Sequence, residues 1–229
     1  MTDISQHIAQ VQQRIIAAAK AANREPVEIK LLAISKTRPP EDIIAAVNAG
    51  QTAFGENYLQ DALTKIAALE AEYPDIEWHF IGAIQSNKTK EIACHFDWIH
   101  TLERLKIAQR LNNQRPESLA PLQVCIQVNI SGEDSKSGIP ADQVLALAEQ
   151  IADLPRLRLR GLMAIPAATQ DPTKQRVAFA KLHALYEQLN KQGFELDTLS
   201  MGMSTDLEAA IAEGSTLVRI GTAIFGART

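Results

Sequence analysis

The 229-residue chain carries 23 basic and 27 acidic side chains, for a net charge of −4, and the two kinds are interspersed. It therefore lacks the basic patch that binding to a nucleic-acid backbone requires. No segment reaches the roughly 18 apolar residues of a membrane span, and the start, MTDISQHIAQ, lacks the basic and apolar regions of a secretory signal. We expect a cytoplasmic protein that has neither a nucleic acid nor a membrane as partner.

The cysteines and histidines indicate neither a disulfide nor a metal cofactor. Cys94 and Cys125 are far apart, and Cys125 lies in the apolar run LQVCIQVNI, so we expect two reduced thiols, with Cys125 in the core. The five histidines are scattered without the spacing of a zinc site. His79 lies in the strand-like EWHFIG, and we expect it to be a hydrogen-bonded core or rim residue rather than a catalytic one.

Short β-rich segments alternate with helix-periodic segments along the whole chain. A helix over residues 3–22 precedes the first strand. The predicted strands cover residues 29–35, 52–56, 77–82, 97–102, 122–130, 158–165, 198–202 and 216–221. Helices are predicted over 39–50, 57–73, 103–114, 141–154, 173–193 and 205–214, and Gly50 and Gly193 end two of them as C-terminal caps do.

This alternation, without any Pro-, Ser- or Gly-rich linker, predicts an α/β fold: a single (β/α)₈ TIM barrel with an extra N-terminal helix, forming one domain over residues 1–229. A doubly wound open sheet is the competing architecture. Against it, no G-x-G-x-x-G follows the first strand, where the sequence reads SKTRPP. In a barrel, functional groups gather where strands end and the following loops begin.

Lys36 occupies such a position, at the end of the apolar strand in KLLAISKTRPP. One interpretation is a lysine that extends its charged end into water, as most lysines near strand ends do. The other is an amine in a dry pocket that forms a Schiff base with a carbonyl compound. The choice between them depends on the other strand ends.

Polar residues and glycines follow several other strands. The candidates for a binding site are Asn57, Met163, Ser200, Gly202, Ser204, Arg219, Gly221 and Thr222. Ser204 is a plausible N-cap of the helix in TDLEAAIAEG, Gly221 allows close backbone approach, and the Thr222 hydroxyl can donate to an oxygen. The loops after strands seven and eight are the usual phosphate site of a TIM barrel. An aldehyde that carries a phosphate fits both a lysine and such loops, and pyridoxal 5′-phosphate is one.

Long motifs also point to a known family. The sequence resembles the pyridoxal-phosphate homeostasis proteins from Leu31 to Arg228, on the segments LLAISKTRP, FGENYLQD, WHFIGAIQSNK, VNISGEDSKSG, RGLMAIP and LSMGMSTDLEAAIAEGSTLVRIGTAIFGAR. The resemblance implies an alanine-racemase-like barrel that carries the cofactor as an internal aldimine on Lys36. Ala83 stands where members of the family often have proline, which affects only the local loop.

The resemblance further implies a non-catalytic role, in which the protein binds, buffers or delivers the cofactor in vitamin B6 homeostasis and so affects amino-acid metabolism. We expect a monomer whose partners are the cofactor and apo-enzymes that require it. A racemase-like enzyme is the alternative, but two-base racemisation needs proton donors on both faces of the substrate carbon, and Lys36 supplies one. Of the three tyrosines, Tyr58 begins a helix and Tyr73 and Tyr186 lie in helix-like segments. A Schiff-base aldolase is a third possibility, because a barrel does not determine the reaction.

Arg219 bears on the same choice. Strand alternation from Gly221 points Arg219 into the barrel mouth, where the matching arginine of the racemase-like fold contacts the pyridine nitrogen of the cofactor. A guanidinium only donates hydrogen bonds, so it keeps that nitrogen unprotonated and the ring a poor electron sink. The other interpretation is an ion pair between Arg219 and an acid at the rim.

Overall fold

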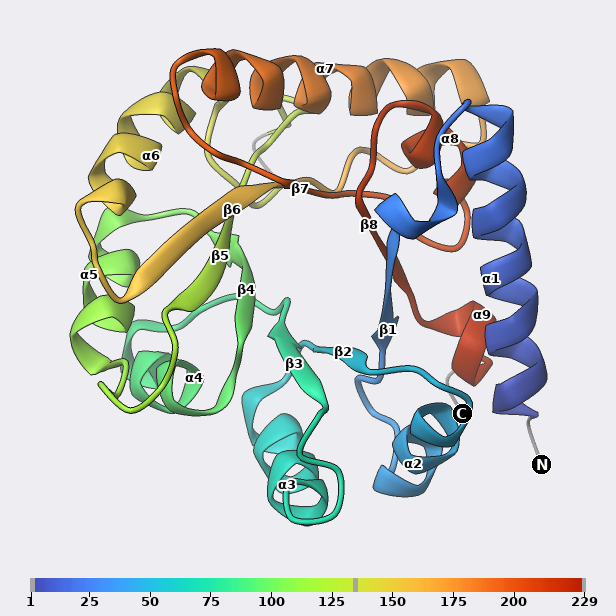
Figure 1. Ribbon diagram of the computed structural model, residues 1–229. Coiled ribbons are helices and arrows are strands. Elements are labelled where there is room, and N and C mark those ends of the chain that lie inside the picture. Colours follow the sequence, from blue (N-terminus) through green and yellow to red (C-terminus); the bar gives the residue numbers. More distant parts are fainter. Residues whose placement is uncertain (1–2, 134–135, 228–229) are drawn as a thin grey trace.

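The computed structural model describes residues 3–133 and 136–227, and in these ranges eight parallel strands close into a barrel in chain order (Figure 1). The strands are β1 (Lys30–Ile34), β2 (Ala53–Glu56), β3 (Glu77–Phe80), β4 (Trp98–Leu102), β5 (Leu122–Gln127), β6 (Leu157–Met163), β7 (Thr198–Ser200) and β8 (Leu217–Ile220). Pairing of β1 with β8 closes the ring. The predicted TIM barrel is therefore confirmed, and the open-sheet alternative is wrong.

Helices surround the ring of strands (Figure 1). They are α1 (Ile4–Ala21), α2 (Pro40–Asn48), α3 (Leu59–Leu69), α4 (Thr89–His95), α5 (Leu105–Gln114), α6 (Val144–Ala152), α7 (Pro172–Lys191), α8 (Leu207–Ala212) and α9 (Thr222–Phe225), with 3₁₀ turns at Pro26–Glu28, Ser86–Lys88 and Ala141–Gln143. Gly50 and Gly193 follow α2 and α7 with positive φ angles, as the capping interpretation predicted. The sequence patterns did not indicate α4 and α9, because seven and four residues are too short to show helical periodicity.

The extra N-terminal helix is present as α1, which packs against α2, α8 and α9 (Figure 1). Asp3 caps it by accepting a hydrogen bond from the Gln6 N–H group. Arg14 of α1 pairs with Glu208 of α8 and donates a 3.1 Å hydrogen bond to the carbonyl of Ser204. The helix therefore holds the loop between β7 and α8 from outside the barrel.

The inside of the barrel has two unlike sides. One side is apolar and is made by Leu32, Ile34, Ala53 and Leu217. The other side combines a cluster of Trp98, Cys125 and Met163 with the buried polar residues His79, His100, Ser200 and Arg219. Cys125 is a fully buried free thiol, as predicted, and burial raises its pKa to about 12.

Among the described residues, no helix is long and apolar enough to cross a membrane. In the same ranges, His, Cys, Asp and Glu side chains form no group of three or more that could hold a metal ion. The main hydrophobic core lies between the strands and the helices, where α1 to α9 bury their apolar faces.

Candidate functional site

Lys36 lies in the turn that follows β1, at the carboxyl-terminal opening of the barrel. Leu32 and Ile34 face the inside of the barrel. Lys36 lies two residues beyond the end of β1 and is partly buried. The turn is tight: the Arg38 N–H group donates to the Ser35 carbonyl at 3.0 Å, and Thr37 has a φ of 62°. That conformation is rare for a β-branched residue and persists only where surrounding contacts impose it.

Those contacts come from a buried ionic cluster on the outer face of the barrel wall, which we call the Lys65 cluster: Ser35, Glu56, Asp61 and Lys65. Lys65 of α3 donates to Glu56 Oε1 at 2.8 Å, to the Ser35 carbonyl at 2.8 Å and to Asp61 Oδ2 at 2.7 Å. Ser35 also donates to Glu56 Oε1 at 2.6 Å, and Asp61 accepts from the Thr37 N–H group. All three donors of the ammonium are used, so the cluster anchors both sides of the turn that carries Lys36.

Two of the three charged groups of the Lys65 cluster are removed from water, since Glu56 is 0% and Lys65 1% exposed. The third, the Asp61 carboxylate, lies at the edge of the cluster with its side chain 38% exposed. Burial raises the pKa of Glu56, while the charge and hydrogen bond of Lys65 oppose that rise. The sequence patterns did not indicate this cluster. The available signals were a charged residue at the end of β2 and the Asp61–Lys65 spacing of four, but neither indicates burial.

Arg219 lies inside the barrel, as strand alternation predicted, and is 4% exposed. Its Nη1 donates to Ser200 Oγ at 2.7 Å and its Nη2 donates to the Ala164 carbonyl at 3.0 Å. Burial lowers the pKa of Arg219 to about 10, although Asp206 opposes the change. Met163, also predicted for the site, is 1% exposed and packs against Trp98 and Cys125 inside the barrel. The Ser200 hydroxyl therefore lies inside the barrel, where it contacts Arg219, and not in the loop that follows β7.

The loop after β7 differs from the prediction in one respect. Ser204 does not cap α8, because that helix begins at Leu207 and Asp206 occupies the N-cap position. The Asp206 carboxylate instead accepts from the Met203 N–H group at 2.5 Å, which closes a turn before the helix starts. Gly202 has a φ of 96°, and a Cβ atom there would be 2.6 Å from the Ala210 Cβ atom, so glycine is required.

The end of β8 approaches the end of β1 closely. A Cβ atom at Gly221 would lie 3.3 Å from both the Cβ and carbonyl oxygen atoms of Ile34, so the glycine allows this approach. Thr222 is exposed and begins α9. The end of β8 therefore lies next to the end of β1, which leads into the Lys36 turn.

Asn57 follows β2, where its Nδ2 lies 3.5 Å from the Ile81 carbonyl. Its Oδ1 is buried and has no hydrogen-bond partner, an unusual state for a polar atom in a folded protein. Gly82 permits this contact between loops, since a Cβ atom there would be 2.0 Å from the Asn57 carbonyl oxygen. Asn57 also borders a cavity of about 470 Å³ that Ala83 and Lys88 help to line.

Strand order brings the predicted residues together. Met163, Ser200 and Arg219 lie on β6, β7 and β8, Lys36 and Asn57 follow β1 and β2, and these five strands are consecutive neighbours in the closed ring. Gly202 and Ser204 lie in the loop after β7, and Gly221 and Thr222 lie where β8 leads into α9. The other lysines in strand-end loops, Lys88 and Lys136, follow β3 and β5.

The donor set fits a phosphorylated aldehyde with an aromatic nitrogen. Lys36 supplies the amine, Arg219 supplies a buried donor that cannot accept, and glycines and hydroxyls follow β7 and β8. The profile of the alanine racemase N-terminal domain family matches residues 6–229. Fold and sequence therefore define an alanine-racemase-type barrel.

Relatives refine this assignment. The chain is 58% identical over 228 residues to the pyridoxal phosphate homeostasis protein of Pasteurella multocida, covering 98% of this chain and 97% of the relative. It is 54% identical to the protein of the same name from Escherichia coli K12, covering 100% and 98%. PipY of Synechococcus elongatus, solved with pyridoxal phosphate bound, superposes with a TM-score of 0.83 at 32% identity and covers 97% and 100%. The chain belongs to the pyridoxal phosphate homeostasis protein family.

Proposed function

We propose that this protein binds pyridoxal 5′-phosphate through a Schiff base on Lys36 and acts in homeostasis of that cofactor, with an effect on amino-acid metabolism. The observation that carries the proposal is the arc of five neighbouring strands that joins Lys36, Arg219 and the loops after β7 and β8. The names of the relatives and the cofactor bound to PipY support it.

Each candidate residue has a role in this proposal. The Lys36 amine adds to the aldehyde carbon, water leaves, and a carbon–nitrogen double bond remains. Gly202, Ser204, Gly221 and Thr222 hold the phosphate. Met163 and Asn57 line the site, and the unpartnered Asn57 Oδ1 can accept a hydrogen bond there.

Arg219 distinguishes a carrier from an enzyme. The cofactor supplies an aldehyde and a ring that can withdraw electrons when its nitrogen is protonated. Arg219 is held by Ser200 and Ala164 and donates to that nitrogen in this proposal, so the nitrogen stays unprotonated and carbanion chemistry is disfavoured. We therefore place binding and delivery of the cofactor to apo-enzymes, by a monomer, above racemase or aldolase activity.

The Schiff base is tested by visible spectroscopy before and after borohydride, followed by mapping of the modified peptide. The parent protein is expected to be yellow and to carry the reduced adduct on Lys36. Lys36→Ala should be colourless and folded, while Lys88→Ala and Lys136→Ala, the matched controls, should stay yellow. A reducible adduct on Lys88 or Lys136 in the Lys36→Ala protein would contradict the assignment of the Schiff base to Lys36.

The phosphate site is tested by titration with pyridoxal phosphate. Loss of one hydroxyl bonded to a charged phosphate should cost about 1.5–3 kcal/mol of binding free energy. Ser204→Ala and Thr222→Val are each expected to bind more weakly by that amount. Parent-like binding by both variants would place the phosphate elsewhere.

The enzyme alternatives are tested by single-turnover assays with L-alanine. Arg219→Glu lets the ring nitrogen take a proton, so slow transamination to the pyridoxamine form should become easier to detect than in the parent. Rapid transamination or racemisation by the parent would contradict both the role of Arg219 and the carrier proposal. A Schiff-base aldolase, whose lysine bonds its substrate directly and not pyridoxal phosphate, would purify without the visible band.

A further inference from the structure

A continuous chain of side-chain hydrogen bonds runs through the inside of the barrel below Arg219. Arg219 Nη1 lies 2.7 Å from Ser200 Oγ, which lies 2.8 Å from His100 Nδ1. His100 Nε2 lies 2.8 Å from His79 Nδ1, and His79 Nε2 is hydrogen-bonded to Glu77 Oε1. The chain therefore joins the mouth of the barrel, where the cofactor is proposed to bind, to Glu77 at the opposite end, and we call these five residues the lumen chain.

When both histidines are neutral, the two ends of the lumen chain determine the direction of every bond in it. The Glu77 carboxylate only accepts, so His79 carries its proton on Nε2 and its Nδ1 accepts from His100 Nε2. His100 Nδ1 is then also an acceptor, so the Ser200 hydroxyl must donate to it. The Ser200 oxygen is left to accept from Arg219, which only donates. Two neutral histidines of the same tautomer satisfy the whole chain, with each donor directed toward Glu77.

The surroundings favour this neutral arrangement. His79 and His100 are 0% exposed, and burial lowers the pKa of both. Burial would raise the pKa of Glu77, but hydrogen bonds from His79 and Lys30 lower it to about 2, so it remains a carboxylate. The other charged groups near the lumen chain are Asp206, which lies near Arg219, and Arg160 and Asp197, which lie at the amino-terminal end of the barrel. The nearby Cys125 thiol is neutral.

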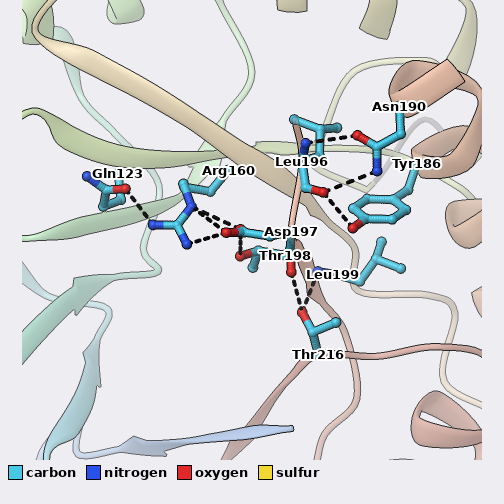
Figure 2. A network of polar contacts seen from close by, with 9 residues as sticks. All are labelled: Gln123, Arg160, Tyr186, Asn190, Leu196, Asp197, Thr198, Leu199 and Thr216. Carbon is cyan, nitrogen blue, oxygen red and sulfur yellow. Dashed lines mark hydrogen bonds and ion pairs between the residues drawn. The ribbon is translucent and has the colours of Figure 1, made fainter. Parts of the chain in front are cut away.

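Contacts at the amino-terminal end of the barrel hold the Glu77 end of the lumen chain in place. Figure 2 shows that Arg160 of β6 donates hydrogen bonds to the Asp197 carboxylate and to Gln123 of β5. The Arg160 guanidinium also lies 4.9 Å from the centre of the Trp98 ring, which stacks on His79 at 5.4 Å with an 8° tilt. These contacts fix the plane of the His79 ring, which a directed hydrogen bond requires.

Filling space does not require these polar groups. The adjoining part of the same interior is filled by Leu32, Ile34, Ala53 and Leu217, so apolar side chains can close this barrel. A buried guanidinium, by contrast, needs a counter-charge or several hydrogen bonds to offset its lost hydration. Through bonds that all point one way, the lumen chain links the Arg219 charge to the Glu77 carboxylate.

We propose that Glu77, His79, His100 and Ser200 are positioning residues that hold Arg219 as a donor and carry the charge of Glu77 to the pyridine end of the bound cofactor. This inference rests on the proposed function, because it assumes that Arg219 meets that nitrogen. Its consequence is that a residue at the far end of the barrel sets how strongly the guanidinium withdraws electrons from the cofactor ring.

The direction of the hydrogen bonds in the lumen chain is tested on the protein without cofactor. The measurement is ¹⁵N NMR of the histidine side chains at neutral pH. His79→Gln and His100→Gln assign the two sets of signals. Both rings are expected to be neutral and protonated on Nε2. A charged ring, or a proton on Nδ1 of either ring, would overturn the proposal whether or not the protein binds pyridoxal phosphate.

The link to the cofactor is tested with Glu77→Gln, which removes the charge and keeps the shape. Without the negative charge of Glu77, the positive charge of Arg219 is balanced less. The guanidinium then withdraws more electron density from the cofactor ring, so the pH midpoint of the visible cofactor band is expected to fall. Affinity should change by less than about tenfold, because the phosphate loops are untouched. Asp97→Asn is the matched control, since Asp97 at the same end of the barrel bonds the Trp78 N–H group.

An unchanged midpoint in a folded Glu77→Gln protein, or an equal shift in Asp97→Asn, would overturn the link. If the parent shows no visible band with pyridoxal phosphate, the proposed function fails, while the NMR result still decides the direction of the chain. If Glu77→Gln does not fold, Ser200→Ala replaces it, because it removes the hydroxyl that joins Arg219 to His100. The midpoint is then expected to shift, and an unchanged midpoint would overturn the link.

Discussion

The Lys65 cluster and the lumen chain lie on opposite faces of the same barrel wall and solve the problem of buried charge differently. In the Lys65 cluster, Glu56 and Lys65 meet directly at 2.8 Å and both are buried. In the lumen chain, Arg219 and Glu77 are separated by Ser200 and two histidines. The first arrangement is compact and charged, and the second is extended and mostly neutral.

The difference indicates what each arrangement is suited to. A direct buried ion pair makes a rigid support, because removal of either partner leaves a charge without compensation. The Lys65 cluster accordingly lies under the strained Thr37 turn that carries Lys36. A chain of neutral groups between two charges transmits polarisation and adapts to the protonation of its members. We therefore expect the first region to govern stability and the second to govern the properties of a bound ligand.

The largest effect is expected from Lys65→Met, which leaves the Glu56 carboxylate buried without its partner. Breaking such a pair costs about 3–5 kcal/mol of unfolding free energy. Urea unfolding at pH 7 measures it. The double variant Lys65→Met, Glu56→Gln is the control and should lose less, because no charge is stranded. A loss below about 1 kcal/mol in Lys65→Met would mean that the cluster does not support the folded structure in this way.

An intermediate effect is expected from the pH dependence of stability at Glu77. Its pKa of about 2 lies below the ordinary value of 4.5, so the unfolded chain binds the proton more readily. The stabilisation is complete above about pH 4.5 and is lost as the pH falls toward 2. Because the side chain is 33% exposed, screening reduces the difference to about 1–2 kcal/mol.

Urea unfolding of parent and Glu77→Gln at pH 7 and pH 3 tests this prediction. The buried histidines, whose pKa values lie below 6.5, make both proteins less stable as the pH falls below that value. The extra loss in the parent belongs to Glu77. Equal losses in both proteins would show that Glu77 is not held by His79 and Lys30 in solution.

The smallest effect is expected from Asp61→Asn, at the exposed edge of the Lys65 cluster. Its carboxylate side chain is 38% exposed, so the pair with Lys65 is screened and should be worth less than about 1 kcal/mol. Glu208→Gln, which removes the exposed partner of Arg14, provides the reference for a surface pair. A cost similar to that of Lys65→Met would move the centre of the cluster from Glu56 to Asp61.

Local patterns predicted most of the fold. Apolar runs with periods of two and 3.6 reflect which side chains each strand and helix buries, so eight strands and the barrel followed from them. Strand ends predicted where Lys36 and Arg219 lie, because parallel strands deliver their carboxyl ends to one opening. The N-cap expected at Ser204 was wrong, because the choice among neighbouring polar residues depends on a contact from Asp206 to Met203.

The sequence by itself determined the barrel, its extra helix and the arc of residues around Lys36, because these depend on the order and periodicity of side chains along the chain. Only the tertiary structure decided which polar residues are buried together. Glu56 and Lys65 are nine residues apart, but Ser200 and His100 are separated by 100. Such partners meet only when the ring of strands closes. Whether a side chain points into or out of the barrel then decides if its charge contacts water, an ion or another residue.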